Sequence, residues 1–225
     1  MKTIVLTGAT GLIGKAFVDL FAIPRHAHLR IVARTKPNYE IPADAEVVIV
    51  KNFHDKDEIR SALKEADEMV CCIGTTIKKA GSKQAFESTD VGIVQMLSEV
   101  AAEFSYTGFH YVSSIDANAQ SSNFYLQCKG RAEQAVLEKK FVKTTMLRPS
   151  MLLGPRQEFR LGELIGKFLM KALPFVFFGP LKRYRSIQAE TVAKTLLYRA
   201  MSDNEDHLVL ESEDIKEYVR LKINF

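Results

Sequence analysis

The sequence predicts an α/β fold in which helices cover both faces of a doubly wound parallel sheet. Short β-branched and aliphatic runs alternate with amphipathic runs throughout the first half of the chain, a pattern typical of parallel βαβ units. The first apolar run, residues 3–6, breaks into glycines at positions 8, 11 and 14, and an amphipathic run over residues 12–21 follows. A strand, a glycine turn and a helix in this order begin a sheet of the Rossmann type.

The glycine turn predicts a dinucleotide site. Small residues let the backbone approach a pyrophosphate closely, and the free N–H groups at a helix N-terminus bind its charge. Glycines at this spacing also occur in flexible surface loops, but here they directly follow the first strand. The residues of this turn expected to bind the cofactor are Gly8, Thr10, Gly11, Leu12, Ile13 and Gly14.

Composition bounds the class of protein. The 225 residues are enough for a single domain, 1–225, in which we expect residues 151–185 to form a substrate-side segment. Hydrophobic residues make up 47% and charged residues 26%, which is ordinary for a soluble globular protein. The net charge of +4 suits an anionic ligand, but without a basic motif it does not indicate nucleic acid.

The location is expected to be cytoplasmic. The cysteines Cys71, Cys72 and Cys128 are odd in number and indicate buried reduced thiols. No histidine or cysteine stands at a metal-ligand spacing, so no metal site is predicted. The chain enters a strand at once, which leaves no room for a signal peptide. The apolar run 168–178 is too short for a membrane span and is broken by Pro174.

Arg34 determines the expected form of the cofactor. Residues 29–33 read as the second strand, and Arg34 directly follows them. NAD-binding versions of this fold place an acid there, which accepts hydrogen bonds from the ribose hydroxyls. A guanidinium instead binds a 2′-phosphate through two hydrogen bonds and stacks on the adenine. The alternative is a solvated surface arginine. NADP(H) is therefore favoured over NAD(H).

The next elements continue the alternation of strands and helices. The fourth strand ends in Gly74 and Thr75, whose small side chains would let the cofactor lie over the carboxyl edge of the sheet. The apolar face of the long helix that follows is assigned to the core. The expected elements are strands at 46–50 and 69–73, helices at 55–66 and 83–104, and a polar loop at 78–82.

The residues that carry chemistry follow the fifth strand. This strand, expected at 109–112, ends in Ser113 and Ser114, and a helix then opens at Tyr125. Tyr125 and Lys129 are four apart and share one face of that helix. A nearby ammonium stabilises a phenolate and lowers a tyrosine pKa from about 10, which suits proton transfer at neutral pH. The alternative for this pair alone is a tyrosine at the core edge with a solvated lysine.

Together, the glycine turn, the two serines and the Tyr125–Lys129 pair resemble the short-chain dehydrogenase/reductase superfamily. Within it, the chain is similar to an atypical branch, the Tat-interacting-protein-like oxidoreductases and their bacterial relatives, also labelled epimerase-like or semialdehyde-dehydrogenase-like. The resemblance extends from the glycine turn to about Glu158. The runs that carry it are CIGTT at 72–76, KAG at 79–81, VSS at 112–114, SSNFYLQCKG at 121–130 and LRPSMLLGPRQE at 147–158.

This resemblance implies roles for the reacting groups. Ser114, Tyr125 and Lys129 would form the reacting centre, and Lys129 would also hold the nicotinamide ribose. Ser113 is the alternative to Ser114, because the sequence does not distinguish two adjacent serines.

For the cofactor, the resemblance implies NADP(H) lying across the glycine turn and Arg34, with its nicotinamide end near Arg148 and Pro149. Two positions depart from the pattern. Asp90 stands where extended relatives usually carry asparagine, and Asn52 stands where an aspartate beside the adenine is usual. The adenine contacts are therefore less defined than the phosphate contacts.

Charged residues follow a sixth strand, which is expected at 142–147. Arg156, Glu158 and Arg160 come in quick succession. They would either hold an anionic substrate or pair with one another at the surface.

Aromatic residues mark the rest of the substrate side. The patch Phe175, Phe177 and Phe178 is interpreted as a lid over the substrate, or as packing on the sheet edge or against a second subunit of a homodimer. The other elements expected in this part are helices at 160–173, 188–201 and 214–221 and a strand at 207–210.

The predicted function is an NADP(H)-dependent oxidoreductase that transfers a hydride to or from a carbonyl or alcohol of a small molecule. Tyr125 would give a proton to the substrate oxygen or remove one, while the serine orients that oxygen. An epimerase or dehydratase using the same residues is a variant of this class. The alternative from a different class is an NADP(H)-binding sensor or interaction protein with little turnover, because fold alone does not decide function.

Overall fold

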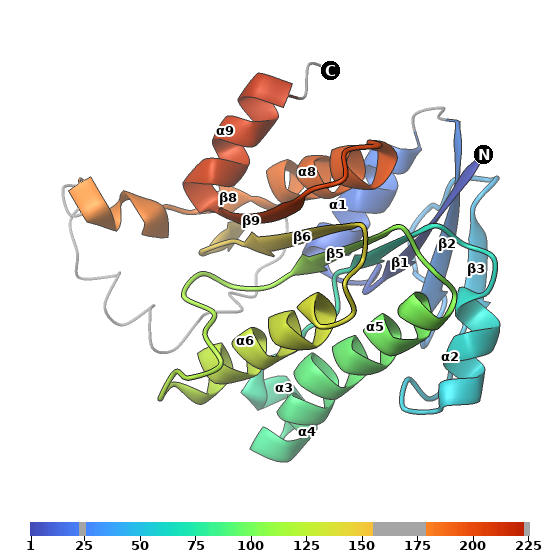
Figure 1. Cartoon of the computed structure of the whole chain (residues 1–225), viewed down its shortest axis with the longest axis horizontal. Helices are drawn as coiled ribbons and strands as arrows, with labels where there is room; N and C mark the ends of the chain where they lie inside the picture. The colour runs from blue at the N-terminus through green and yellow to red at the C-terminus, as the bar shows by residue number, and fades with distance from the viewer. Residues whose placement is uncertain (23–25, 155–178, 223–225) are drawn as a thin grey trace.

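The computed structural model describes residues 1–22, 26–154 and 179–222. Seven of its strands form one sheet, in which every neighbouring pair is parallel (Figure 1). In their spatial order they are β3 (Glu46–Ile49), β2 (Ala27–Ala33), β1 (Lys2–Thr7), β4 (Glu68–Cys71), β5 (Gly108–Val112), β6 (Lys143–Arg148) and β9 (His207–Glu211). A separate parallel pair joins β7 (Leu152–Leu153) to β8 (Ile187–Gln188).

Helices cover both faces of the sheet (Figure 1). One face carries α1 (Leu12–Phe21), α8 (Ala189–Met201) and α9 (Ser212–Lys222), and the other carries α2 (Lys56–Leu63), α5 (Ile93–Glu103) and α6 (Phe124–Leu137). The shorter helical segments are α3 (Ile77–Ala80), α4 (Lys83–Glu87), the π-helical turn η1 (Ser88–Gly92) and the 3-10 segment η3 (Gly179–Tyr184). The predicted doubly wound architecture is confirmed.

Alternating side chains of the central strands supply two cores, one on each face. In β1, Ile4 and Leu6 pack into the core under α1 and α8, whereas Val5 packs into the core on the opposite face. All three side chains are fully buried. Burial on both faces explains why β1 reads as a continuous apolar run rather than an alternating one.

The order of the strands reverses between β1 and β4, because the chain builds from β1 out to β3 and then returns to β4 on the other side of β1. In open α/β sheets, ligands bind at such a point, in the crevice outside the carboxyl ends of the strands. The glycine turn follows β1 and residues 72–75 follow β4. Two of the predicted cofactor segments therefore meet at one crevice.

Two stretches differ from the expected elements. Residues 78–82, expected as a polar loop, include part of helix α3, because the Thr76 side chain accepts a hydrogen bond from Lys79 N and caps this helix. The long helix expected at 83–104 is interrupted by the π-helical turn η1, which carries the buried Asp90. The C-terminal strand and helix are confirmed as β9 and α9, with β9 paired to β6 at the sheet edge.

Several predicted features lie outside the described residues. They are the charged cluster Arg156, Glu158 and Arg160, the helix at 160–173, and the aromatic patch Phe175, Phe177 and Phe178. The three cysteines are buried thiols, as predicted. In the part of the chain that is described, no helix has both the length and the apolar character needed to cross a membrane.

Candidate active site

The glycine turn brings backbone against backbone. Gly8 has φ +79°, in the left-handed region, and its carbonyl oxygen accepts a hydrogen bond from Gly11 N at 2.9 Å. A Cβ on Gly14 would lie 2.3 Å from that same carbonyl oxygen, so only glycine allows α1 to start this close to the turn. Gly11 is the N-cap residue of α1, and its missing side chain leaves the first N–H groups of the helix open to a ligand.

Beyond this turn lies a pocket of about 330 Å³ on the adenosine side of the predicted cofactor site. Arg34 and Thr35 border it from the end of β2, and Lys79 borders it from α3. Gly8, Thr10 and Gly11 of the turn, and Gly74 and Thr75 after β4, also line it. Two cationic side chains, Arg34 and Lys79, therefore border the pocket in which Arg34 is expected to bind a 2′-phosphate.

The sequence predicts no role for Lys79, which belongs to the stretch expected as a polar loop. The signal that could have indicated it is its position eight residues after the end of β4, close to the edge where the cofactor was expected. Lys78, its neighbour on α3, does not line the pocket.

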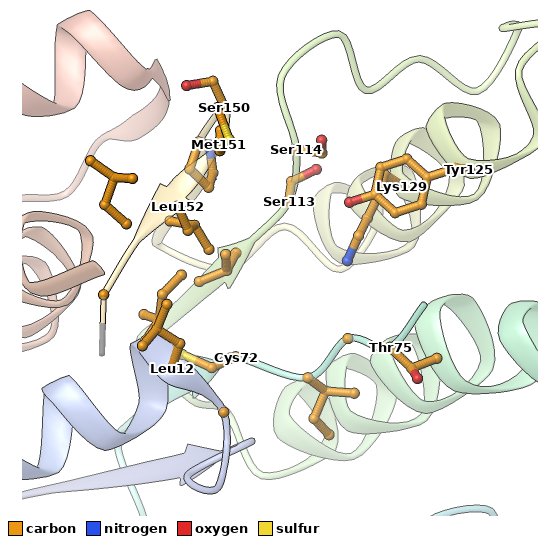
Figure 2. Close-up of a pocket in the computed structure, with 18 residues that line it drawn as sticks. Leu12, Cys72, Thr75, Ser113, Ser114, Tyr125, Lys129, Ser150, Met151 and Leu152 are labelled. Carbon is orange, nitrogen blue, oxygen red and sulfur yellow. The ribbon is translucent and has the colours of Figure 1, made fainter. Parts of the chain in front are cut away.

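A second cavity, of about 170 Å³, continues the crevice toward β5 and α6. Figure 2 shows the Tyr125 ring and the Lys129 side chain entering it from α6, with Ser113 and Ser114 arriving from the loop after β5. The structure therefore brings the four residues predicted for the reacting centre into one cavity. The predicted cofactor residues that also line this cavity are Gly11, Leu12, Ile13, Gly74, Thr75 and Pro149.

The two serines are held by the backbone that follows β5. Ser113 N donates a hydrogen bond to Leu147 O at 2.7 Å, which keeps the chain paired to β6 beyond the end of the strand. Both hydroxyl oxygens are buried, and neither has a hydrogen-bond partner among the described residues. Buried polar groups are normally satisfied, so unsatisfied hydroxyls at a cavity are suited to a ligand. In Figure 2 the Ser113 side chain points toward Tyr125.

Tyr125 sits in the first turn of α6, where two contacts place it. The side chain of Asn123 caps the helix and accepts a hydrogen bond from Tyr125 N at 3.0 Å. The ring of Tyr125 packs against Phe86 of α4 with centroids 5.7 Å apart. These contacts hold the ring at the rim of the cavity.

Lys129 is buried, with 5% of its side chain exposed, so the alternative of a solvated lysine is wrong. Its Nζ lies 2.9 Å from Asp90 Oδ1 and donates a hydrogen bond to Tyr111 Oη at 3.0 Å. Burial alone would lower the pKa of Lys129, but the charge of Asp90, followed by Tyr111 and Tyr125, outweighs it and holds this pKa well above its usual value. The ammonium is therefore charged throughout the physiological range.

Arg148 lies apart from the reacting centre. Its Nε and Nη2 donate to Glu133 Oε1 and Oε2 of α6, at 2.9 and 2.5 Å. It lines neither described cavity, whereas the adjacent Pro149 lines the second one. Of the two residues expected near the nicotinamide end, only Pro149 lines a cavity, and the guanidinium of Arg148 instead ties β6 to α6.

Hydrogen bonds tie the segment around residues 183–185 to the serine loop. Arg183 Nη2 and Tyr184 Oη donate to the two oxygens of Asp116, at 2.6 and 2.8 Å. Ser150 Oγ donates to Arg185 O at 2.5 Å. The C-terminal end of the expected substrate-side segment is thus attached to the loop that carries the serines, through Asp116, and to Ser150 after β6.

This fold and crevice define an NAD(P)-binding protein of the Rossmann type. The chain belongs to the NAD(P)H-binding family, whose match covers residues 8–169. Protein HTATIP2 of Rattus norvegicus is 33% identical over 178 residues, which cover 77% of this chain and 72% of that protein. The mitochondrial protein FMP52 of Candida albicans is 32% identical over 161 residues, 70% of each chain. The resemblance to the atypical short-chain dehydrogenase/reductase branch is confirmed.

Solved structures share the fold over nearly the whole chain. The Bordetella bronchiseptica enzyme WbmH, in complex with NAD+, superimposes with a TM-score of 0.69 at 14% identity, over 98% of this chain and 79% of that one. A UDP-glucuronic acid 4-epimerase from Bacillus cereus, in complex with UDP-glucuronic acid and NAD, gives a TM-score of 0.67 at 15% identity, over 97% and 82%.

Proposed function

We propose that the protein is an NADP(H)-dependent oxidoreductase that transfers a hydride to or from a carbonyl or alcohol of a small molecule. One observation carries this proposal: two unsatisfied serine hydroxyls and the Tyr125–Lys129 pair enter the same cavity at the carboxyl edge of the sheet. A carbonyl oxygen bound there has hydrogen-bond donors and a proton source within one small volume.

The residues present fit a dinucleotide. The close approach of Gly14 to Gly8 leaves room for a pyrophosphate at the N-terminus of α1. The first turn of this helix, Leu12 to Lys15, contains no acidic residue that would repel the phosphates. The two cavities together line the crevice from the end of β2 to α6. An extended cofactor would be held there with its adenosine beside Arg34 and its nicotinamide beside Tyr125.

The protein's own groups supply positioning and proton transfer. When bound, the nicotinamide supplies or accepts the hydride. Ser114, with Ser113 as the alternative, donates a hydrogen bond to the substrate oxygen. Tyr125 delivers a proton to that oxygen during reduction and removes it during oxidation. The Lys129 ammonium lies beside Tyr125 and is placed to hold the nicotinamide ribose.

The preference for NADP(H) rests on the cations at the adenosine pocket. Arg34 stands where an acid would accept hydrogen bonds from the ribose of NAD, and Lys79 borders the same pocket. Two positive side chains favour a 2′-phosphate over a 2′-hydroxyl.

A second candidate is an epimerase or dehydratase, favoured by the similarity to the UDP-glucuronic acid 4-epimerase. It would use the same tyrosine and lysine with a cofactor retained through the cycle.

We further propose a single domain acting on a small, anionic substrate. A homodimer and a cytoplasmic location stay predictions, and the relatives named FMP52 are called mitochondrial proteins.

Tyr125→Phe tests the proposed function. With NADPH and a panel of quinones and aromatic aldehydes, we expect the variant to lose turnover by roughly 10²- to 10⁴-fold, because it lacks the transferable proton. Its NADPH affinity should stay at the wild-type value. The matched control is Tyr218→Phe on α9, which should leave both quantities unchanged. Turnover of Tyr125→Phe at the wild-type rate would contradict the proposal, and wild-type protein that binds NADPH but reduces none of the panel would favour the sensor alternative.

A further inference from the structure

The carboxylate of Asp90 is buried in the interior directly against the reacting centre. Asp90 is fully buried and belongs to the π-helical turn η1, which widens the helix between α4 and α5 at this point. One oxygen, Oδ2, accepts a hydrogen bond from Thr75 N at 2.8 Å. The other, Oδ1, lies 2.9 Å from Lys129 Nζ. Asp90 therefore connects the cofactor-side loop after β4 to the lysine on α6.

We propose that Asp90 is a positioning residue that fixes the Lys129 ammonium and compensates its charge, so that Tyr125 keeps its proton and the site is set for reduction of a carbonyl rather than oxidation of an alcohol. This inference rests on the proposed function, since it assigns a preferred direction to the same reaction.

The hydrogen-bonding capacity of Lys129 supports the positioning role. An ammonium has three N–H donors. One is donated to Tyr111 Oη, and the carboxylate of Asp90 holds the ammonium as an ion-pair partner 2.9 Å away. Both of these partners are fully buried. They fix the position of the ammonium beside the cavity that Lys129 lines with Tyr125.

The charges around Lys129 support the second part of the proposal, that Asp90 compensates the charge of the ammonium. The groups that face it are Asp90 from η1, Tyr111 from β5, Tyr125 and Cys128 from α6 and Cys71 from β4. Burial raises the pKa of the two thiols and of the Tyr111 phenol, so all three are neutral. Asp90 then balances the ammonium, and the pair has no net charge. An uncompensated ammonium would stabilise a Tyr125 phenolate much more strongly.

A protonated tyrosine suits one direction of the reaction. In reduction, a hydride adds to the carbonyl carbon, the electron pair of the C=O π bond moves to oxygen, and the Tyr125 proton is transferred to that oxygen. The phenolate left behind takes up a proton from water. In oxidation the phenolate must exist first, so a site that keeps the proton on Tyr125 slows this direction at neutral pH.

The experiment follows the ionisation of Tyr125 directly, without a substrate. Protein labelled with ¹³C at the tyrosine ζ carbon is titrated by NMR, and the Tyr125 signal is assigned by its loss in Tyr125→Phe. In Asp90→Asn, which keeps the size of the side chain and removes its charge, we expect the midpoint of the Tyr125 transition to move down by about one pH unit or more. The matched control is Tyr111→Phe, which removes a hydrogen bond to the ammonium but no charge and should move the midpoint less.

An unchanged midpoint in a folded Asp90→Asn protein would overturn the inference. If this variant does not fold, ¹⁵Nζ-lysine NMR of the wild-type protein replaces it: the Lys129 ammonium should keep its protons at a pH at which the exposed lysines have lost theirs. Loss of the Lys129 protons together with the others would equally overturn the inference.

Turnover separates this inference from the proposed function. With the quinone and aldehyde panel, Asp90→Asn should begin to lose NADPH-dependent reduction at a pH about one unit lower than wild type. With the corresponding alcohols and NADP+, it should gain oxidation at neutral pH. A shifted Tyr125 transition in a protein without turnover would refute the proposed function alone. Normal turnover with an unshifted transition would refute the role of Asp90 alone.

Discussion

The backbone of Gly14 packs directly on the carbonyl of Gly8, where a Cβ on Gly14 would lie 2.3 Å from the oxygen. This contact closes the turn between β1 and α1 and aims the start of the helix at the crevice. It accounts for the third glycine of the motif, which lines neither described cavity. The residue shapes the cofactor site without lining it.

Gly14→Ala should weaken NADPH binding by at least about tenfold, because the added methyl group forces the start of α1 away from the turn. Isothermal titration calorimetry measures the change. The control is Gly92→Ala in η1, where the new Cβ would meet only the His54 side chain, at 3.5 Å. Equal affinities in both variants and the wild type would contradict the assignment of the pyrophosphate to this turn.

Lys79→Gln should weaken binding of 2′,5′-ADP by about fivefold, since an exposed cation near a phosphate contributes roughly 1 kcal/mol. Binding of 5′-AMP, which lacks the 2′-phosphate, should stay unchanged. Lys78→Gln removes the same charge from the same short helix outside the pocket and serves as the control. An equal loss of 2′,5′-ADP affinity in the Lys78 variant would show that the net positive charge of α3, and not a specific contact of Lys79, causes the loss.

Arg148→Met should lower the free energy of unfolding by about 2 kcal/mol and leave NADPH affinity intact, because it strands the carboxylate of Glu133. The Glu133 side chain is 5% exposed, and its carboxylate accepts two hydrogen bonds from Arg148. Urea unfolding measures the loss. The same substitution at Arg220, whose pair with Glu217 is exposed, should cost less than about 0.5 kcal/mol. Lost cofactor affinity in Arg148→Met would instead place Arg148 at the nicotinamide.

Acid should destabilise the protein through His110. Burial lowers the pKa of His110 below its usual value of 6.5, although the adjacent Glu68 raises it. Its Nε2 lies 3.1 Å from Glu68 Oε2 and its Nδ1 lies 3.0 Å from Thr145 Oγ1, so a neutral ring with the proton on Nε2 satisfies both contacts. Below about pH 6.5 the unfolded chain therefore binds a proton at His110 that the folded chain does not bind.

The His110 contribution is therefore fully present above about pH 6.5 and is lost as the pH falls below it, with a limiting slope of about 1.4 kcal/mol per pH unit. Unfolding free energies measured from pH 7.5 to 5 should fall less steeply in His110→Gln than in the wild type. The exposed His54 provides the control, as His54→Gln. Parallel curves for His110→Gln and the wild type would contradict this role of burial.

Much of the fold and the site could be predicted from the sequence, because the relevant signals are local. All strands of a parallel sheet end at the same edge. The residues that directly follow the strands therefore lie close together, whatever path the chain takes between one strand and the next. The glycine turn, Arg34 and the serines after β5 were placed by that rule alone. Tyr125 and Lys129 were paired by the helical repeat.

The remainder depends on contacts between distant segments. Asp90 meets Lys129 only because η1 packs against α6, and a spacing of 39 residues gives no sign of it. Lys79 borders the same pocket as Arg34 because α3 lies beside this crevice after the end of β4. The pairing of Arg148 with Glu133 likewise needs the packing of α6 on the sheet. The type of a residue does not show which distant residue it will contact, or whether that contact will be buried and charged.

Calorimetric titration of the wild-type protein and of Arg34→Glu with NADPH and with NADH measures the cofactor preference that we assign to Arg34. We expect NADPH to bind the wild type more tightly than NADH does. In Arg34→Glu, NADPH affinity should fall by about ten- to a hundredfold, because a carboxylate replaces the guanidinium beside the 2′-phosphate, while NADH affinity changes little. Tighter binding of NADH to the wild type would contradict the NADP(H) assignment. Binding of neither cofactor would contradict the site itself.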